Sequence, residues 1–165
     1  MNKLFSGSVI KQFRFDETLR YMEDREFVFR VLSKTTSIGY VPTPVYYYYQ
    51  NNPTSISKSS GMETRIDQVR SLQKCLAFAD TTFSEFPEYG DYISACLLQN
   101  AGFRKKRAIE CGLPSQVEEL EPIIRETAKR VRRAKHLGTK VKFRFLLEHD
   151  APGLFHLVAR ILGKS

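Results

Sequence analysis

The feature that most constrains the fold is the small number of β-prone stretches. Only two occur in 165 residues, SIGYV at 37–41 and PVYYYYQ at 44–50. Pro42 and Pro44 lack N–H donors and suit the start of a strand or the edge of a sheet. Two strands alone do not stand stably in water. We therefore expect residues 1–60 to be the end of a larger sheet domain, so that the chain is part of something longer.

Helical periodicity dominates the rest of the sequence. Apolar residues recur at helical spacing in residues 23–35, and again in 62–80 and 89–111. The expected fold is therefore α+β and mostly α. A helix and two strands fall within residues 1–60, and a C-terminal helical region occupies residues 61–165. The length suffices for one ordinary domain with a real core.

A further helix is expected after Pro114. Ser115 and Glu118 have the spacing of a capping box, in which the two side chains satisfy free backbone N–H groups at the start of a helix. Pro122 lies inside the same segment, and it predicts a break or a restart because proline lacks the N–H that a helix uses. Two amphipathic pieces, KVKFRFLLEHD and PGLFHLVARIL, complete the chain.

Charge is distributed unevenly along the chain, whose formal net charge is +8. Residues 1–60 hold 8 basic and 5 acidic side chains, residues 61–100 hold 3 and 6, and residues 101–165 hold 15 and 7. A local surplus of Lys and Arg suggests a docking surface for the phosphates of nucleic acid or of lipid headgroups. The candidates are RKKR at 104–107 and KRVRRAKH at 129–136, which otherwise are solvated helix faces.

The stretch YMEDREFVFR, residues 21–30, places two adjacent acids at the start of a predicted helix. One interpretation is helix capping, since an acid in the first turn accepts hydrogen bonds from free N–H groups and suits the positive end of the helix dipole. The other interpretation is that Glu23 or Asp24 belongs to a reaction centre as a general base. Taken by itself, the stretch favours capping.

The cysteines and histidines indicate no metal site. Cys75, Cys96 and Cys111 are odd in number and form no C-x-x-C motif, so we expect free and mostly buried thiols. The three histidines form no H-E-x-x-H or similar pattern. No run approaches the roughly 20 apolar residues of a membrane span, and no secretory pattern opens the chain. The expected location is the cytoplasm, with the inner face of the plasma membrane as a peripheral site.

Several short motifs follow one another in the first 58 residues. They are NKLF, then RFDE, then EDREF opening a helix, then the proline-tyrosine run, and finally SIS. This ordered set resembles the C-terminal part of bacterial family 2 glycosyltransferases with the GT-A fold, which build capsular, exopolysaccharide or O-antigen chains. The resemblance covers about residues 2–58. The sequence contains no D-x-D motif and no Gly-rich phosphate loop. The resemblance therefore implies an enzyme that lacks its N-terminal nucleotide-sugar-binding half.

The resemblance also implies an activity and a site. The activity is transfer of a sugar, with inversion, from a nucleotide diphosphate sugar to a saccharide or lipid-linked acceptor, and we expect this portion to be inactive alone. Asp24 matches the catalytic base of the family. Glu23, Arg25, Tyr48 and Gln50 are the implied acceptor-binding residues. Relatives often carry Arg where Gln50 stands, so a phosphate clamp is not expected there. The full-length enzyme would use Mg²⁺ or Mn²⁺, with no metal held by this chain alone.

Alternatives remain open at three points. A non-catalytic basic helical module that binds nucleic acid or a protein partner would explain the charge but not the ordered motifs, so nucleic acid is not the expected partner. The tyrosines at 46–49 either stack on sugar rings or pack on both faces of a strand. Residues 140–163 either lie on an anionic membrane surface or fold back onto the other helices. Open strand edges at 37–50 suggest a homo-oligomer.

Overall fold

A computed structural model describes residues 3–44 and 65–150. All regular secondary structure in these residues is helical. The helices are α1 (Gly7–Ile10), α2 (Glu23–Leu32), α5 (Asp67–Thr82), α6 (Pro87–Glu110), α7 (Pro114–Arg133) and α8 (Thr139–Asp150).

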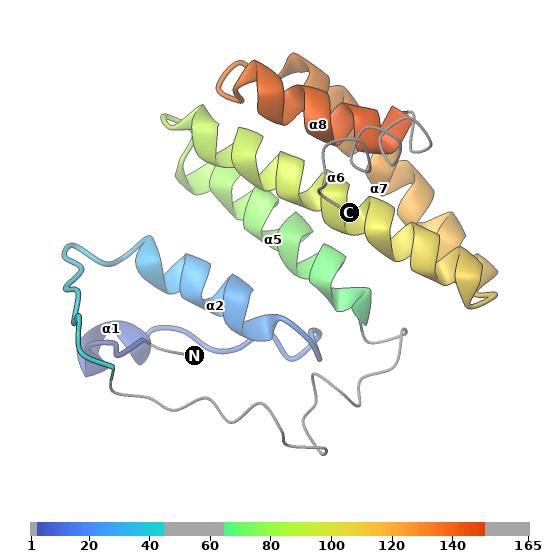
Figure 1. The fold of residues 1–165 in the computed structure, drawn as a ribbon. Coiled ribbons are helices and arrows are strands. Elements are labelled where there is room, and N and C mark those ends of the chain that lie inside the picture. Colours follow the sequence, from blue (N-terminus) through green and yellow to red (C-terminus); the bar gives the residue numbers. More distant parts are fainter. Residues whose placement is uncertain (1–2, 45–64, 151–165) are drawn as a thin grey trace.

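The predicted fold class, a helix plus two strands at the end of a GT-A-type domain, is wrong for the described chain. Residues 37–41 form no strand and run as an irregular segment after α2 (Figure 1). Their β-prone side chains are exposed, Ile38 at 79% and Tyr40 at 87%. Such residues favour a strand through packing against a neighbouring strand, and no described segment offers one. Of the second predicted strand only Pro44 is described, and it is irregular too; residues 45–50 lie outside the described residues.

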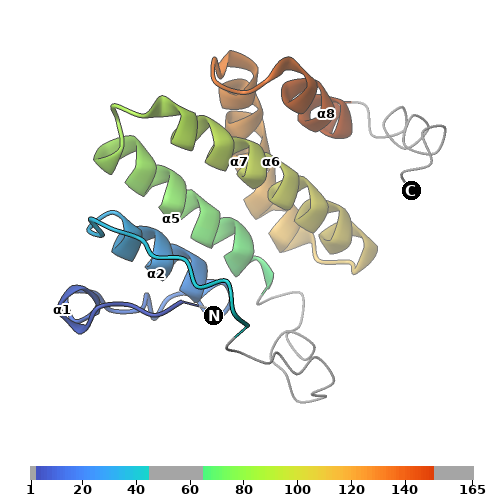
Figure 2. The ribbon, with the colours of Figure 1, turned by 60° about the vertical axis from the view of Figure 1, so that its left-hand side comes forward.

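The helices form a stack that begins with α2 and ends with α8. α2 packs against α5, α5 packs against α6, and α6 forms a long hairpin with α7. α8 then crosses back over both α6 and α7. Figures 1 and 2 show α2 and α8 at opposite ends of this stack, with α5 and α6 between them. The N-terminal and C-terminal ends of the described chain therefore belong to different ends of the molecule.

The core lies between α5, α6 and α7. Buried apolar residues recur at helical spacing on α5, as the sequence predicts, and meet a matching stripe on α7 that includes Leu120 and Val131. The α6–α7 hairpin turns at Gly112, whose φ of 67° suits glycine because it has no side chain to clash. Next to it, the Leu113 N–H donates to the Ala108 carbonyl at 2.9 Å and closes the end of α6.

The expected capping box and helix break in α7 are both absent. The N-cap residue is Leu113, and Pro114 occupies the first turn, where its missing N–H costs nothing. α7 continues through Pro122 to Arg133. Pro122 is exposed, so the carbonyl that loses its helical partner can bond to water, while Leu120 and Ile124 on either side are buried in the core. Tertiary packing thus keeps the helix intact across the proline.

The first of the two C-terminal amphipathic pieces is α8, and it packs onto the bundle. Phe145 and Leu146 lie against the core formed by the other helices. The second piece falls among residues 151–165, outside the described part of the chain. No helix among the described residues has the length and apolar character that crossing a bilayer requires.

Candidate functional site

The loop that precedes α2 is fastened by polar side chains of α5. Asp67 accepts a hydrogen bond from the Arg20 N–H at 2.8 Å, and the Ser71 hydroxyl donates to the Met22 carbonyl at 2.9 Å. Lys74, one turn further along α5, forms an ion pair with Asp16. These α5 residues are spaced i, i+4 and i+7, so they share one side of the helix. They fix the backbone from which α2 begins.

Asp16 is the outer anchor of this loop. Its carboxylate accepts hydrogen bonds from the Thr18 N–H at 2.9 Å and from the Thr18 hydroxyl at 2.5 Å, in addition to the Lys74 ammonium. These donors stabilise the charged form, with Lys74 the largest contributor, and lower the pKa of Asp16 from 3.8 to about 2. The loop is therefore held by charge as well as by backbone contacts.

The start of α2 has an unusual N-cap. Met22 occupies that position with φ 62° and ψ 23°, in the left-handed region that non-glycine residues rarely adopt. Its side chain cannot cap the helix, and Ser71 holds its carbonyl from α5. A residue kept in such a conformation by surrounding contacts is a feature of functional sites as well as of tight turns.

Glu23 and Asp24 occupy the first turn of α2 and are half-buried. Neither carboxylate forms a hydrogen bond or an ion pair with the described residues, so neither caps a backbone N–H there. Their position still suits the helix dipole, which favours acids at this end. Within the described ranges, both carboxylates are therefore left without a partner.

The third acid of the stretch, Glu26, has a structural role that the sequence analysis missed. It is buried, and Arg30 holds both of its oxygens through contacts of 2.5 Å and 3.0 Å. Arg30 also donates to the Arg14 carbonyl at 2.7 Å and lies over the Phe27 ring. The Glu26–Arg30 pair thus ties α2 to the preceding chain. Its i, i+4 spacing is a signal that sequence reading can find.

The predicted site residues are only partly brought together in the described chain. Glu23, Asp24 and Arg25 are consecutive in the first turn of α2, and the Arg25 guanidinium lies 3.7 Å from the Met22 sulfur. Tyr48 and Gln50 lie outside the described residues. The structure therefore places the candidate base Asp24 and its proposed neighbours Glu23 and Arg25 together in the first turn of α2.

The residues that position Asp24 were not predicted. Asp67, Ser71 and Lys74 contact partners that lie 47, 49 and 58 positions earlier in the chain. Their common spacing beside the apolar stripe of α5 is visible in the sequence. The sequence does not reveal which residues they contact, because each contact depends on how two distant segments pack.

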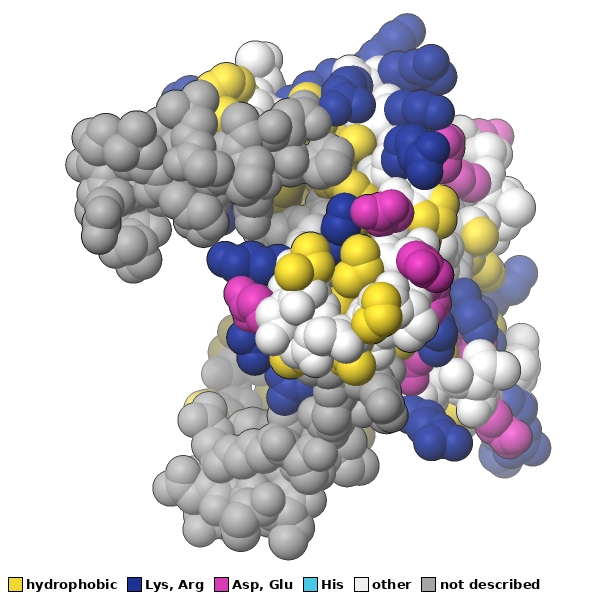
Figure 3. Space-filling view, turned by 90° about the vertical axis from the view of Figure 1, so that its right-hand side faces the viewer, with side chains coloured by type: hydrophobic (Ala, Val, Ile, Leu, Met, Phe, Trp, Pro, Cys, Tyr) yellow, Lys and Arg dark blue, Asp and Glu magenta, His cyan; other side chains and the backbone are white. Residues whose placement is uncertain are grey.

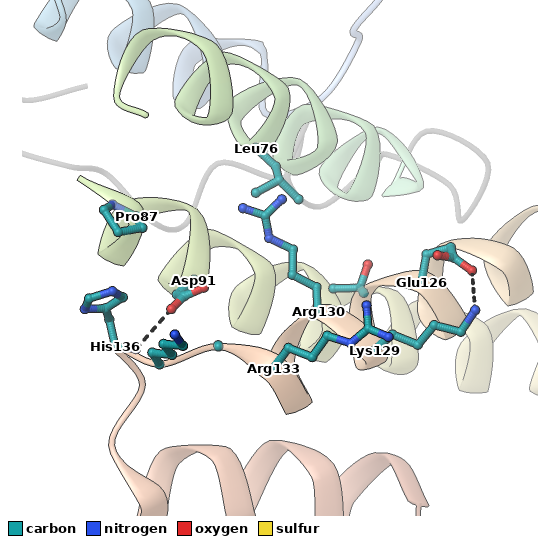
Figure 4. A pocket seen from close by; sticks show the side chains of 11 residues that line it. Leu76, Pro87, Asp91, Glu126, Lys129, Arg130, Arg133 and His136 are labelled. Carbon is teal, nitrogen blue, oxygen red and sulfur yellow. Dashed lines mark hydrogen bonds and ion pairs between the residues drawn. The ribbon is translucent and has the colours of Figure 1, made fainter. Parts of the chain in front are cut away.

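A second cluster of charged residues lines a cavity of about 760 Å³ near the end of α7 (Figure 4). Arg130 extends from α7 toward Leu76 and forms a two-pronged ion pair with Asp80, with both contacts at 2.6 Å. Gly90 lies beside this pair, and a Cβ there would lie 2.5 Å from the Arg130 guanidinium and displace it. Asp91 accepts the His136 N–H at 3.1 Å. No residue of α2 lines this cavity, so Asp24 lies elsewhere.

The two basic runs differ in how many of their charges are already paired. In RKKR, Arg104 is buried and donates a hydrogen bond of 2.5 Å to Gln68. Lys105 forms an ion pair with Glu121 at 2.9 Å. Arg107 forms an ion pair with Glu110 at 2.6 Å. Burial lowers the pKa of Arg104. The run therefore serves the fold more than a ligand.

The second run keeps more of its charge available. Within the described residues, Arg133 and Lys135 form no hydrogen bond or ion pair through their side chains, and both are exposed. Figure 3 shows Lys and Arg side chains in a row along the upper right edge of one side of the molecule, at the height of α8 in Figure 1. This end of the bundle thus carries a row of cationic side chains on the side shown.

The described residues offer no metal site, and the buried thiol of Cys75 is not activated. No group of three His, Cys, Asp or Glu side chains among them could hold a metal ion. The cysteines are free, as expected, but only Cys75 is buried, while Cys96 is half-buried and Cys111 is exposed. Burial, helped by the nearby Glu26 charge, raises the pKa of Cys75 to about 11, so its thiol stays protonated at neutral pH.

Comparison with protein-family models, with curated proteins and with solved structures found no match to this chain.

Proposed function

We propose that this chain supplies the acceptor-side general base of an inverting glycosyl transfer, and that Asp24 is that base. The supporting observation is the state of its carboxylate, which is half-exposed and forms no hydrogen bond or ion pair with the described residues. A general base needs a free carboxylate on a rigid support. The contacts from α5 to the Arg20 and Met22 backbone give α2 such a support.

In the proposed reaction Asp24 takes the proton of the acceptor hydroxyl as that oxygen bonds to the anomeric carbon of the donor sugar. The bond between this carbon and the nucleoside diphosphate breaks, and the diphosphate leaves with the electron pair. Attack from the face opposite the leaving group inverts the anomeric centre. Glu23 and Arg25 flank the base, and Tyr48 and Gln50 complete the proposed acceptor site.

In this proposal the described residues do not bind the nucleotide-sugar donor. The side chains of the described residues do not fit the divalent ion that bridges a nucleotide diphosphate, since no group of three metal-ligating residues occurs among them. The sequence as a whole has no D-x-D motif. We therefore expect the nucleotide sugar and its Mg²⁺ or Mn²⁺ to be held by another segment or subunit.

A second candidate function is a non-catalytic basic helical module that binds nucleic acid or a protein partner. Arg133 and Lys135, which are exposed and have no ion-pair partner in the part of the chain that the structure describes, favour it. Binding of this kind weakens steeply with salt and would not depend on Asp24, which lies in α2 at the other end of the stack (Figure 1). The two functions therefore respond to different substitutions.

The test is the turnover of the Asp24→Asn variant, measured with the nucleotide-sugar-binding half present on the same chain or as a partner. Loss of a general base should lower kcat about 100-fold or more and leave donor binding nearly intact. Glu23→Gln is the matched control one residue away and should lower kcat less than Asp24→Asn does. Turnover like that of the wild type in Asp24→Asn would remove Asp24 from the mechanism.

A further inference from the structure

The end of the molecule formed by α8 and the C-terminal end of α7 concentrates positive charge. Residues 125–150, which run to the end of α8, hold nine Lys and Arg side chains and three acids, Glu126, Glu148 and Asp150. Glu126 is already paired with Lys129 at 2.9 Å. We propose that this end of the molecule docks on an anionic lipid bilayer, independently of the glycosyl transfer proposed above.

The charges that would face the lipid are available. Within the described residues the side chains of Arg133, Lys135, Lys140 and Arg144 form no hydrogen bond or ion pair, and all four are exposed. Each basic side chain near an anionic membrane surface contributes about 1 kcal/mol to binding. A cluster of four to eight such charges is the usual size of a lipid-binding basic patch.

The orientation of α8 decides which of its side chains can reach a membrane. Phe145 and Leu146 point into the bundle, and the Lys142 ammonium reaches the Arg132 carbonyl at 3.4 Å. At 100° per residue, Lys140 and Arg144 then lie on the opposite, outer side of the helix. The apolar side of α8 is therefore covered, and the outer side is basic.

Apolar side chains flank these outer cations. Phe143 is 65% exposed and Val141 is 41% exposed. Lys and Arg can extend their charged ends to lipid phosphates while a neighbouring aromatic ring enters the boundary between headgroups and acyl chains. We call Lys140, Val141, Phe143 and Arg144, together with Arg133 and Lys135 that line the neighbouring cavity at the end of α7, the α8 face. A DNA duplex would neutralise its cations but offers no free base to stack on an exposed phenylalanine, whereas a bilayer accommodates both, so the combination favours a bilayer over a duplex.

Docking through the α8 face would orient the whole molecule. α2 lies at the other end of the helix stack (Figures 1 and 2). Asp24 would then face away from the bilayer, toward solvent. An acceptor that reaches it would extend from the membrane or be soluble.

The absence of tryptophan from the sequence makes a direct test available. Phe143→Trp introduces a single fluorescent reporter on the α8 face, and Tyr40→Trp introduces one at a position 87% exposed after α2. Vesicles of phosphatidylcholine with 30% phosphatidylglycerol should shift the emission of the Phe143→Trp chain to shorter wavelength, with quenching by spin-labelled lipid. The Tyr40→Trp emission should not change, and neutral vesicles should affect neither chain.

Charge removal tests the same face by vesicle flotation. The triple change Lys135→Gln, Lys140→Gln and Arg144→Gln should weaken binding about 100-fold, at about fivefold for each charge. The control variant carries Lys11→Gln, Arg14→Gln and Lys34→Gln, which remove the same amount of charge at exposed sites of the other end of the molecule. It should weaken vesicle binding about threefold at most.

Four results would overturn the proposal. They are equal losses in the two triple variants, equal binding to neutral and anionic vesicles, no vesicle binding at all, and tighter binding to a 20-base-pair DNA duplex than to anionic vesicles at 150 mM salt. The last of these would assign the α8 face to nucleic acid instead.

Discussion

At the scale of single residues, three acids within four positions of α2 have different environments. Glu26 is buried and neutralised by Arg30, while Glu23 and Asp24 are half-buried without a partner in the described chain. Sequence reading identified the adjacent pair and its place at a helix start. It could not separate capping from catalysis, because that depends on whether a backbone N–H or another side chain reaches each carboxylate.

This difference predicts opposite outcomes for two equivalent substitutions. Glu26→Gln leaves the half-buried Arg30 guanidinium without a full counter-charge and should lower the free energy of unfolding by about 2 kcal/mol. Asp24→Asn removes no contact within the described residues and should change it by about 0.5 kcal/mol at most. Urea unfolding of both variants measures the contrast. Equal losses would mean that Asp24 holds the fold together rather than standing free for chemistry.

At the scale of secondary-structure elements, the helices α2, α5 and α6 were predicted from the sequence, whereas the strand predicted at 37–41 is wrong. Apolar spacing located α2, α5 and α6 to within a few residues, since each buries one side in a common core. The stretch at 37–41 has β-prone residues but no described neighbour, and propensity without a partner does not make a strand. Pro122 shows the converse, because packing of α7 overrides a local helix breaker.

The attachment of the 16–22 loop to α5 also belongs to this scale, and it should depend on pH. The pKa of Asp16 is about 2 in the folded chain, below its ordinary value of 3.8. The stabilisation is therefore complete above about pH 4 and is lost as the pH falls toward 2. Lys74→Met should lower the free energy of unfolding by about 1 kcal/mol at pH 7 and by almost nothing near pH 2.

Urea unfolding at pH 7 and at pH 2 measures this difference. Lys106→Met removes an exposed cation that forms no hydrogen bond within the described residues, and it should leave the free energy of unfolding unchanged at both values. A Lys74→Met effect that stays constant across the pH range would show that the ion pair does not fasten the loop.

At the scale of the whole molecule, the two proposed functions occupy opposite ends of one helical stack. The candidate base lies on α2, and the cationic α8 face lies beyond α6 and α7 (Figure 1). Sequence composition located the positive charge in the last third of the chain. It did not show which cations have a partner in the fold, such as Lys105 in RKKR and Arg130 in the later run, because pairing depends on helix–helix packing.

The central claim is that the Asp24 carboxylate accepts the proton of the acceptor hydroxyl, and chemical rescue tests it most directly. Asp24→Ala removes the carboxylate and should abolish turnover in the enzyme that carries this chain with its nucleotide-sugar-binding half. Added formate, a small carboxylate that can enter the vacated space, should restore measurable turnover to Asp24→Ala and leave the wild type and Glu23→Ala unchanged. If formate raises the turnover of Glu23→Ala instead, or if Asp24→Ala is as active as the wild type without formate, Asp24 is not the base.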